Sequence, residues 1–143
     1  MKVYWDTSAL VSLYIADAHS PSAERHLTRD AGLILHTPLH ALELANAITL
    51  HVFRGEIAPA SAAAARSAWA SDQRQGILTP APWPEGACAT AAHLSTAYSA
   101  RLGVRALDLL HVAAAMELRC DCFLTFDRRQ LALARAAGLD TQH

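Results

Sequence analysis

Two aspartates stand where an open α/β sheet places its ligands. Asp6 directly follows the apolar segment 2–5, and Asp127 follows the apolar segment 122–126. In open parallel sheets, ligands bind beyond the carboxyl ends of the strands, at the point where the strand order reverses. The pattern therefore predicts that both carboxylates face a site. Aspartate is also a favoured N-cap of a helix, so capping is an equally good interpretation of each acid taken alone.

Two further acids interrupt apolar helical patterns. Glu43 lies within Leu-Glu-Leu-Ala-Asn-Ala-Ile, and Asp108 lies within Ala-Leu-Asp-Leu-Leu-His. Carboxylates are almost never fully buried unless they are paired or bound to a metal. If these two face inward, the basic residues nearest in sequence are Arg54 and Arg105. Arg105 precedes Asp108 by three residues, and an ordinary surface ion pair is the commoner outcome for a single acid at that spacing.

Four acids that converge on one cleft need a cation. Two carboxylates about 4 Å apart repel each other by roughly 4 kcal/mol at an effective dielectric constant near 20. Mg²⁺ or Mn²⁺ removes that penalty, because hard carboxylate oxygens suit these ions. Such a site polarises a phosphate oxygen and lowers the pKa of a bound water, so the chemistry indicated is hydrolysis of a phosphate ester.

Alternating strands and helices position these acids. Apolar segments rich in β-forming residues predict strands at 2–5, 33–35, 77–78 and 122–126, with a marginal fifth strand at 139–141. Helical patterns cover 9–18, 20–32, 39–54, 59–75, 87–102, 105–119 and 127–138. This alternation predicts a three-layer α/β/α fold around a central parallel sheet of four or five strands. No boundary is visible, so residues 1–143 are expected to form a single domain.

Composition narrows the class of protein. The 143 residues are 52% hydrophobic and 17% charged, which excludes intrinsic disorder. The formal charge of −1 argues against a protein that coats nucleic acid by bulk charge, although it leaves room for a local basic groove. Cys88, Cys120 and Cys122 give no disulfide framework and are expected to be small buried residues. Without a signal-peptide pattern or an apolar run of about 20 residues, a soluble cytoplasmic protein with no membrane partner is expected.

The four acidic segments, in this order, resemble a known family. The sequence has Asp6-Thr-Ser-Ala-Leu after the first strand, then Glu43-Leu, then Asp108-Leu-Leu-His-Val-Ala-Ala-Ala, and finally Leu-Thr-Phe-Asp127. This is similar to the PIN-domain ribonucleases, and most closely to the VapC-like toxins of bacterial toxin–antitoxin pairs. The resemblance spans nearly the whole chain and implies a PIN-like sheet in which the first and fourth strands are neighbours.

The resemblance implies a role for each acid. Asp6 and Asp108 match the principal metal ligands of the family, and Asp127 matches the third aspartate, which completes or extends the metal site. Glu43 matches the acid that holds a metal-associated water or a second ion. Thr125 matches a small hydroxyl residue that orients the last acid. All four acids are therefore expected to be both catalytic and metal-binding.

The region around Asp127 is less closely matched. Phe126 is bulkier than the residue often found before the final acid, which leaves the placement of Asp127 the most open of the four. Arg128 and Arg129 follow it, where they would hold the RNA backbone at the rim of the cleft. Solvated residues in the first turn of a helix are an equally good interpretation of both. Arg101 and Arg105 are similar candidates.

The activity implied is that of an endoribonuclease that hydrolyses RNA phosphodiester bonds with Mg²⁺ or Mn²⁺ and leaves a 5′-phosphate. The implied partners are the RNA substrate, a small antitoxin protein whose tail plugs the acidic site, and a second copy of the chain in a homodimer. Two alternatives stay open. One is a PIN fold that binds RNA or protein without cutting, and the other is a nuclease of RNA maturation.

Other carboxylate enzymes fit the sequence less well. Haloacid-dehalogenase-like phosphatases and receiver domains require a catalytic lysine, whereas Lys2 is the only lysine and precedes the first strand. A spacing of three residues separates His40 from Glu43 and Asp108 from His111, which is the spacing of di-iron sites in helical bundles. The first pair is reversed and the strands argue against a bundle. The resemblance to PIN domains implies that His111 occupies a position where the histidine packs and does not react.

Overall fold

A parallel sheet forms the centre of the molecule. The computed structural model describes residues 1–29 and 32–143, and within them five strands lie in the order β3-β2-β1-β4-β5. Their bounds are β1 Lys2–Trp5, β2 Leu33–His36, β3 Leu78–Pro80, β4 Cys122–Leu124 and β5 Thr141–Gln142. All neighbouring strands are parallel. Because β1 lies between β2 and β4, the strand order reverses there, and such a reversal is where open sheets bind ligands.

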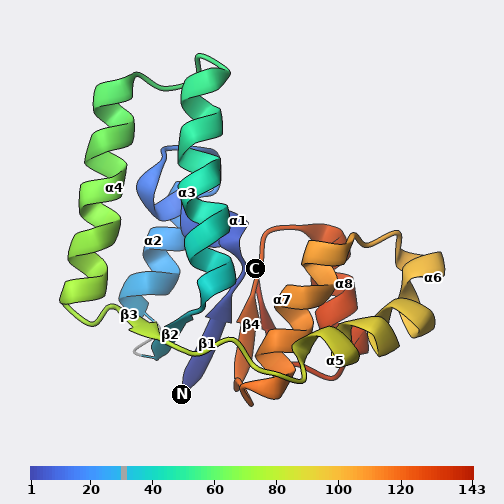
Figure 1. Ribbon diagram of the computed structural model, residues 1–143. Helices are drawn as coiled ribbons and strands as arrows, with labels where there is room; N and C mark the ends of the chain where they lie inside the picture. Colours follow the sequence, from blue (N-terminus) through green and yellow to red (C-terminus); the bar gives the residue numbers. More distant parts are fainter. Residues whose placement is uncertain (30–31) are drawn as a thin grey trace.

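Helices flank this sheet on both sides (Figure 1). One group consists of α1 Thr7–Tyr14, α2 Ser20–Arg29, α3 Pro38–Phe53 and α4 Pro59–Arg74. The other consists of α5 Ala87–Leu94, the π-helical turn η1 Ser95–Ser99, α6 Ala100–Leu102, α7 Ala106–Glu117 and α8 Arg128–Ala136. This arrangement confirms the predicted three-layer α/β/α fold. In the part of the chain that is described, no helix has the length and apolarity needed to cross a membrane.

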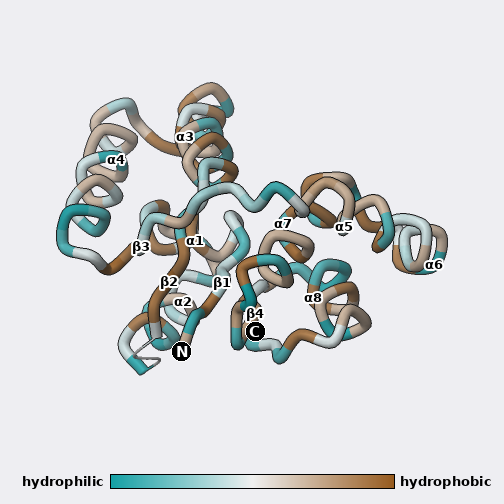
Figure 2. Tube along the Cα trace, turned by 60° about the horizontal axis from the view of Figure 1, so that its bottom comes forward, coloured by the Kyte–Doolittle hydropathy of each residue, from teal (hydrophilic) through white to brown (hydrophobic). Residues whose placement is uncertain are grey.

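Successive residues of the strands pack against opposite layers, because side chains alternate along a strand. Tyr4, Leu35 and Phe123 join the core cluster formed with α5, α7 and α8. Val3 and Trp5 join the cluster formed with α1 and α2. A third cluster fastens the α3–α4 hairpin to α1. Figure 2 shows the hydrophobic colour running along β2 in the middle of the molecule.

His40 ties the start of α3 to the end of β1. Its fully buried ring donates from Nε2 to the carbonyl oxygen of Trp5 at 2.7 Å and accepts at Nδ1 from the backbone N–H of Thr37 at 3.0 Å. Since a backbone N–H can only donate, Nδ1 is the acceptor and Nε2 carries the proton. Burial, together with the nearby His111, lowers the pKa of His40 to about 3. Both nitrogens are thus occupied by protein groups, which leaves neither of them for a metal.

The first helix ends at Tyr14 and not at residue 18 as predicted. Ile15 turns to an extended backbone, with φ −125° and ψ 121°, and its side chain is buried. The Asp17 carboxylate then accepts from the backbone N–H groups of His19 at 2.7 Å and Ser20 at 2.9 Å. Aspartate favours such local bonds over continuing a helix, so the chain turns here.

Other element ends differ by one or two residues. β3 and β5 lie slightly later in the chain than predicted, and β4 ends at Leu124 and not at residue 126. The predicted helix 87–102 is interrupted by η1. The second helix was expected to end at Gly32, and residues 30 and 31, which that segment includes, lie outside the described residues.

One cysteine prediction is wrong. Cys120 and Cys122 are buried as expected, but Cys88 is exposed. The buried face of α5 is formed by Ala87, Ala91 and Leu94. Because successive residues of a helix point about 100° apart, Cys88 faces away from Ala87 and toward solvent. None of the three cysteines forms a disulfide within the described residues.

Candidate active site

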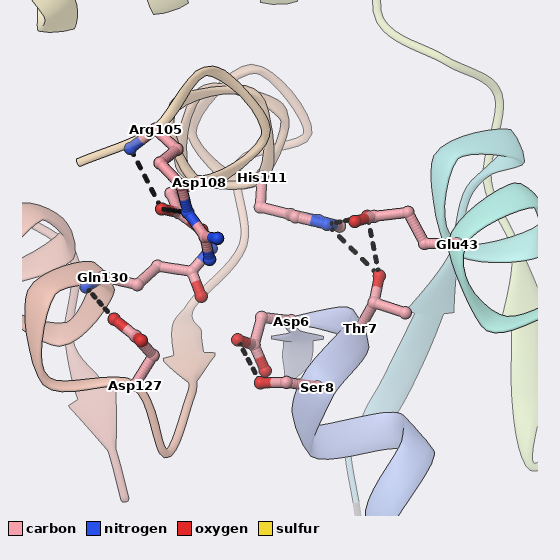
Figure 3. Close-up of a pocket in the computed structure, with 9 residues that line it drawn as sticks. All are labelled: Asp6, Thr7, Ser8, Glu43, Arg105, Asp108, His111, Asp127 and Gln130. Atoms are coloured by element: carbon pink, nitrogen blue, oxygen red, sulfur yellow. Dashed lines mark hydrogen bonds and ion pairs between the residues drawn. The ribbon is translucent and has the colours of Figure 1, made fainter. Parts of the chain in front are cut away.

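One polar pocket at the carboxyl ends of β1 and β4 gathers all four predicted acids (Figure 3). Asp6 comes from the β1–α1 junction, Glu43 from α3, Asp108 from the first turn of α7 and Asp127 from the β4–α8 junction. The pocket has a volume of about 140 Å³. Its lining consists of Asp6, Thr7, Ser8, Glu43, Arg105, Asp108, His111, Asp127 and Gln130.

Asp6 is the most deeply buried of these acids, with 4% of its surface exposed. Its Oδ1 accepts from the backbone N–H of Ala9 at 2.8 Å, so it caps α1. Its Oδ2 accepts from Ser8 Oγ at 2.7 Å and from Thr125 Oγ1 at 2.9 Å. Burial raises the pKa of the Asp6 carboxyl above its ordinary value, and these hydrogen bonds oppose that rise.

The register of the sheet brings Thr125 to Asp6. β1 pairs with β4 so that Trp5 lies beside Leu124. The residues that follow these two, Asp6 and Thr125, are therefore neighbours as well. The pairing also confirms that the first and fourth strands are adjacent. Thr125 was expected to orient the last acid, Asp127. Its hydroxyl instead bonds to the carboxylate of Asp6, and it meets Asp127 only at the backbone N–H, at 3.1 Å.

Asp127 caps α8 while it lines the pocket. Its Oδ1 accepts from the backbone N–H of Gln130 at 2.8 Å. The buried side chain of Gln130 then lies with Oε1 3.1 Å from the hydroxyl of Thr125. Gln130 was not predicted as a site residue, although a glutamine three residues after a capping acid has the spacing of a capping box, which was the available signal.

Asp108 forms the local pair that its spacing allowed. Its Oδ2 accepts from the backbone N–H of Arg105 at 3.1 Å and lies 3.6 Å from the Nε of the same arginine. The Arg105 side chain is 83% exposed, so this ion pair contributes little to stability. The same carboxylate still lines the acidic pocket.

Glu43 is held by His111 and not by Arg54. Its Oε1 accepts hydrogen bonds from Nε2 of His111 and, at 3.0 Å, from the hydroxyl of Thr7. Since an ionised carboxylate only accepts, Nε2 carries the proton that faces it. The other nitrogen, Nδ1, lies 2.9 Å from the buried Tyr4 hydroxyl.

His111 is buried and its ring packs against Tyr4 and His40, as predicted, and it also holds Glu43 and lines the pocket. Burial acts to raise the pKa of the Glu43 carboxyl, but the bonds from His111 and Thr7 bring it below its ordinary value. Burial keeps Tyr4 protonated by raising its pKa far above the ordinary range. Nothing in the sequence alone pointed to the contact between Glu43 and His111, since 68 residues separate its partners.

The four candidate arginines differ in how near they lie to the acidic pocket. Arg128 and Arg129 are exposed at the start of α8 and do not line the acidic pocket. Arg129 donates to the carbonyl oxygen of Gly103 at 3.3 Å. Arg101 lies 5.8 Å from the centre of the Tyr98 ring. Arg105 is the arginine that reaches the pocket lining.

The donor atoms of the pocket have the chemistry of a hard-cation site. Across residues 1–29 and 32–143, no three His, Cys, Asp or Glu side chains are already grouped so as to hold a metal ion. The lining nevertheless offers carboxylate and hydroxyl oxygens and no thiolate. Glu43, Asp108 and Asp127 each use one carboxylate oxygen for their hydrogen bonds and ion pairs to the described residues, so the other oxygen is available. Such oxygens suit Mg²⁺ or Mn²⁺.

Comparison with known proteins identifies the family. Residues 3–138 match the PIN domain. The chain belongs to the PIN domain family. This confirms, at the level of the family, the resemblance carried by the four acidic segments. No curated protein sequence matches this PIN domain.

Three solved structures share the fold of this PIN domain. VapC20 of Mycobacterium tuberculosis, a sarcin–ricin loop cleaving toxin, has a TM-score of 0.68 at 18% identity, covering 96% of this chain and 95% of VapC20. VapBC2 of Rickettsia felis, bound to a DNA fragment from its promoter, has a TM-score of 0.67 at 14% identity, with coverage of 99% and 98%. FitAcB of Neisseria gonorrhoeae has a TM-score of 0.67 at 13% identity, with coverage of 99% and 96%.

The Thr125 hydroxyl gives a direct test of the site's architecture. Thr125→Val keeps the shape of the side chain but removes a hydrogen-bond partner from Asp6, Gln130 and the backbone of Asp127. We expect the free energy of unfolding, measured by urea denaturation, to fall by about 1–3 kcal/mol, because buried polar groups lose their partner.

The matched control is Thr28→Val, which removes an exposed hydroxyl whose bonds among the described residues go to the backbone of its own helix, at 3.0 Å from the Glu24 carbonyl and 3.1 Å from that of Arg25. Its effect should stay within about 0.5 kcal/mol. Equal stability of Thr125→Val and the unsubstituted protein would show that the hydroxyl does not support the acidic site.

Proposed function

We propose that this PIN domain is a divalent-metal-dependent endoribonuclease and the toxin of a toxin–antitoxin pair. The observation that carries the nuclease proposal is that Asp6, Glu43, Asp108 and Asp127 line one polar pocket. They come from four separate segments and meet where the strand order reverses. Local pairing explains each acid separately, but it does not explain why all four share one pocket.

The proposed metal ligands are Asp6, Asp108 and Asp127, with Glu43 holding a second ion or a water. Mutual repulsion makes an arrangement of four carboxylates unfavourable without a cation, so a divalent ion would draw their available oxygens together. When bound, Mg²⁺ or Mn²⁺ supplies Lewis acidity toward a phosphate oxygen and lowers the pKa of a coordinated water.

Hydroxyl and imidazole groups position these acids in the proposed site. Ser8 and Thr125 fix the carboxylate of Asp6 by donating to Oδ2. Thr7 and His111 fix Glu43 through Oε1, which leaves Oε2 as its available oxygen. Groups that orient metal ligands through a second layer of hydrogen bonds typically change metal affinity or activity by about 10- to 100-fold when removed.

RNA is the proposed substrate. PIN family membership supports it, as does the similarity in fold to VapC20, which is a sarcin–ricin loop cleaving toxin. Arg105 reaches the pocket lining, where a guanidinium would bind a phosphate oxygen of the backbone. Arg128 and Arg129 remain proposed contacts to more distant phosphates, because they are exposed beside Asp127.

The toxin proposal is supported by VapC20, a toxin that shares the fold, and by VapBC2 and FitAcB, which share the fold and whose names join two components. The proposed partner is a small antitoxin with a cationic tail, because the pocket it would fill is acidic. The homodimer expected from the sequence stays a prediction.

Asp6→Asn tests the nuclease proposal. Asparagine keeps the size of the side chain but lacks the negative charge that binds a cation. We expect cleavage of RNA in the presence of Mg²⁺ or Mn²⁺ to fall by more than about 100-fold, which exceeds the effect of losing a supporting residue. Cleavage is measured from the appearance of fragments with 5′-phosphate ends.

Asp140→Asn is the matched control, since Asp140 is exposed and does not line the acidic pocket. It should cut at the rate of the unsubstituted chain. Full activity of Asp6→Asn would contradict the mechanism. RNA binding without any cutting by the unsubstituted chain would favour the non-catalytic alternative.

Growth tests the toxin proposal separately. Expression of the unsubstituted chain in a bacterium should arrest growth, and expression of Asp6→Asn should not. Co-expression of the product of the adjacent gene should relieve the arrest, because the antitoxin would occupy the acidic pocket. Efficient RNA cleavage in vitro without any growth arrest would instead favour a nuclease of RNA maturation.

A further inference from the structure

A second hollow adjoins the acidic pocket. It has a volume of about 220 Å³ and shares Ser8 and Asp127 with that pocket. The rest of its lining is Ser12, Asp17, His19 and Phe126. If one phosphate of a nucleic acid lay among the four acids, the nucleotide next to that phosphate would therefore reach this hollow.

Two aromatic rings stack at this hollow. The rings of His19 and Phe126 lie with their centroids 4.7 Å apart and their planes at 8°. Phe126 is half-buried and packs against the core cluster on the α1–α2 side of the sheet, whereas His19 is exposed. Phe126 also directly precedes Asp127. The same bulky residue that departs from the usual family pattern thus forms the base of an aromatic surface beside a proposed metal ligand.

The backbone of His19 is held in place by local hydrogen bonds. Its N–H donates to Asp17 Oδ1 at 2.7 Å, and Ser12 Oγ donates to Asp17 Oδ2 at 2.7 Å. The carbonyl oxygen of His19 accepts from the backbone N–H groups of Ser22 and Ala23, both at 2.9 Å. A ring mounted on a fixed backbone loses little conformational entropy when a ligand stacks on it.

We propose that His19 and Phe126 form a stacking platform for one nucleobase of single-stranded RNA, next to the phosphate that is cut. The proposal rests on the proposed function and specifies its substrate. Unpaired bases are commonly bound by stacking on aromatic side chains, including histidine. Two carboxylates, those of Asp17 and Asp127, border the hollow, so a neutral base fits it better than a second phosphate does.

The platform is expected to increase the affinity for RNA while giving little base specificity. Ser12 and Asp17 bond to each other and to the backbone, which leaves them poorly placed to read the edge of a base. Stacking itself tolerates every base, because each has an aromatic face. We therefore expect a requirement for an unpaired base at this position and not for a particular one.

Binding of two labelled RNA probes tests the platform. The first is hexaadenylate, and the second is a hexamer with the same ribose-phosphate backbone but no bases. Binding is measured by fluorescence anisotropy with Mg²⁺ and the Asp6→Asn chain, which holds the probe without cutting it if the proposed function is right. We expect this chain to bind hexaadenylate about 5- to 100-fold more tightly than the base-free probe.

Substitutions that remove a ring from the platform should reduce the difference in affinity between the two probes. His19→Ala, added to the same chain, should remove most of the preference for the probe with bases, and His19→Tyr should keep it because it retains a ring. His93→Ala is the matched control, since His93 is an exposed histidine on α5 away from both pockets, and it should change nothing. Phe126→Leu, which keeps apolar packing, should weaken the preference as well.

Equal affinity for the two probes, or a preference that survives His19→Ala, would overturn the platform. A further outcome would also overturn the platform: an arginine-containing peptide binds only when His19 is present, while the preference for the probe with bases does not need His19. The hollow would then bind the tail of a protein and not an RNA base. Cleavage by the unsubstituted chain is measured in parallel. A His19-dependent base preference without cleavage would overturn the proposed function and keep the platform, whereas cleavage without the preference would do the reverse.

Discussion

The burial of the Asp6 carboxylate is the constraint on which the rest of the site depends. Three donors hold it, the backbone N–H of Ala9 and the hydroxyls of Ser8 and Thr125, and none of them carries a charge. Each donor requires part of the fold: the start of α1, and the register that brings the end of β4 beside the end of β1. A carboxylate so placed costs free energy to ionise, and a cation in the adjoining pocket would offset that cost.

Capping and function are not alternatives in this structure. Asp6 and Asp127 each use one oxygen to accept from the third backbone N–H after them, and each also lines the acidic pocket. An acid that lies between the end of a strand and the start of a helix stands near the sheet edge and at the helix start at once. The cap fixes the rotamer of the side chain, which keeps the acid pointed toward the pocket.

The parts that local pattern determines could be predicted from the sequence. The sheet and the positions of Asp6 and Asp127 follow from apolar segments that end abruptly in an acid, and the Asp108–Arg105 pair follows from helical spacing. The turn after Tyr14 was missed because residues 15–18 suit a helix equally well, and only the bonds of Asp17 decide against it. Side-chain chemistry here outweighed apolar periodicity.

Individual side-chain contacts between distant segments could not be predicted. Glu43 meets His111 because α3 and α7 both border the end of β1, and only the assembled sheet brings those helices together. The stack of His19 on Phe126 has the same origin, since the loop before α2 and the end of β4 approach each other only across the folded sheet. The sequence pattern predicts the helix or strand in which a residue lies, but it does not predict which distant side chain that residue contacts.

The most direct test of the central claim, that the four acids form one cation site, is the anomalous scattering of manganese in crystals of the unsubstituted chain grown with saturating Mn²⁺. We expect one or two Mn²⁺ peaks within coordination distance of the carboxylates of Asp6, Asp108 and Asp127. A pocket without any manganese peak in crystals that bind the ion elsewhere would contradict the claim, and the four acids would then have to be explained as caps and local ion pairs alone.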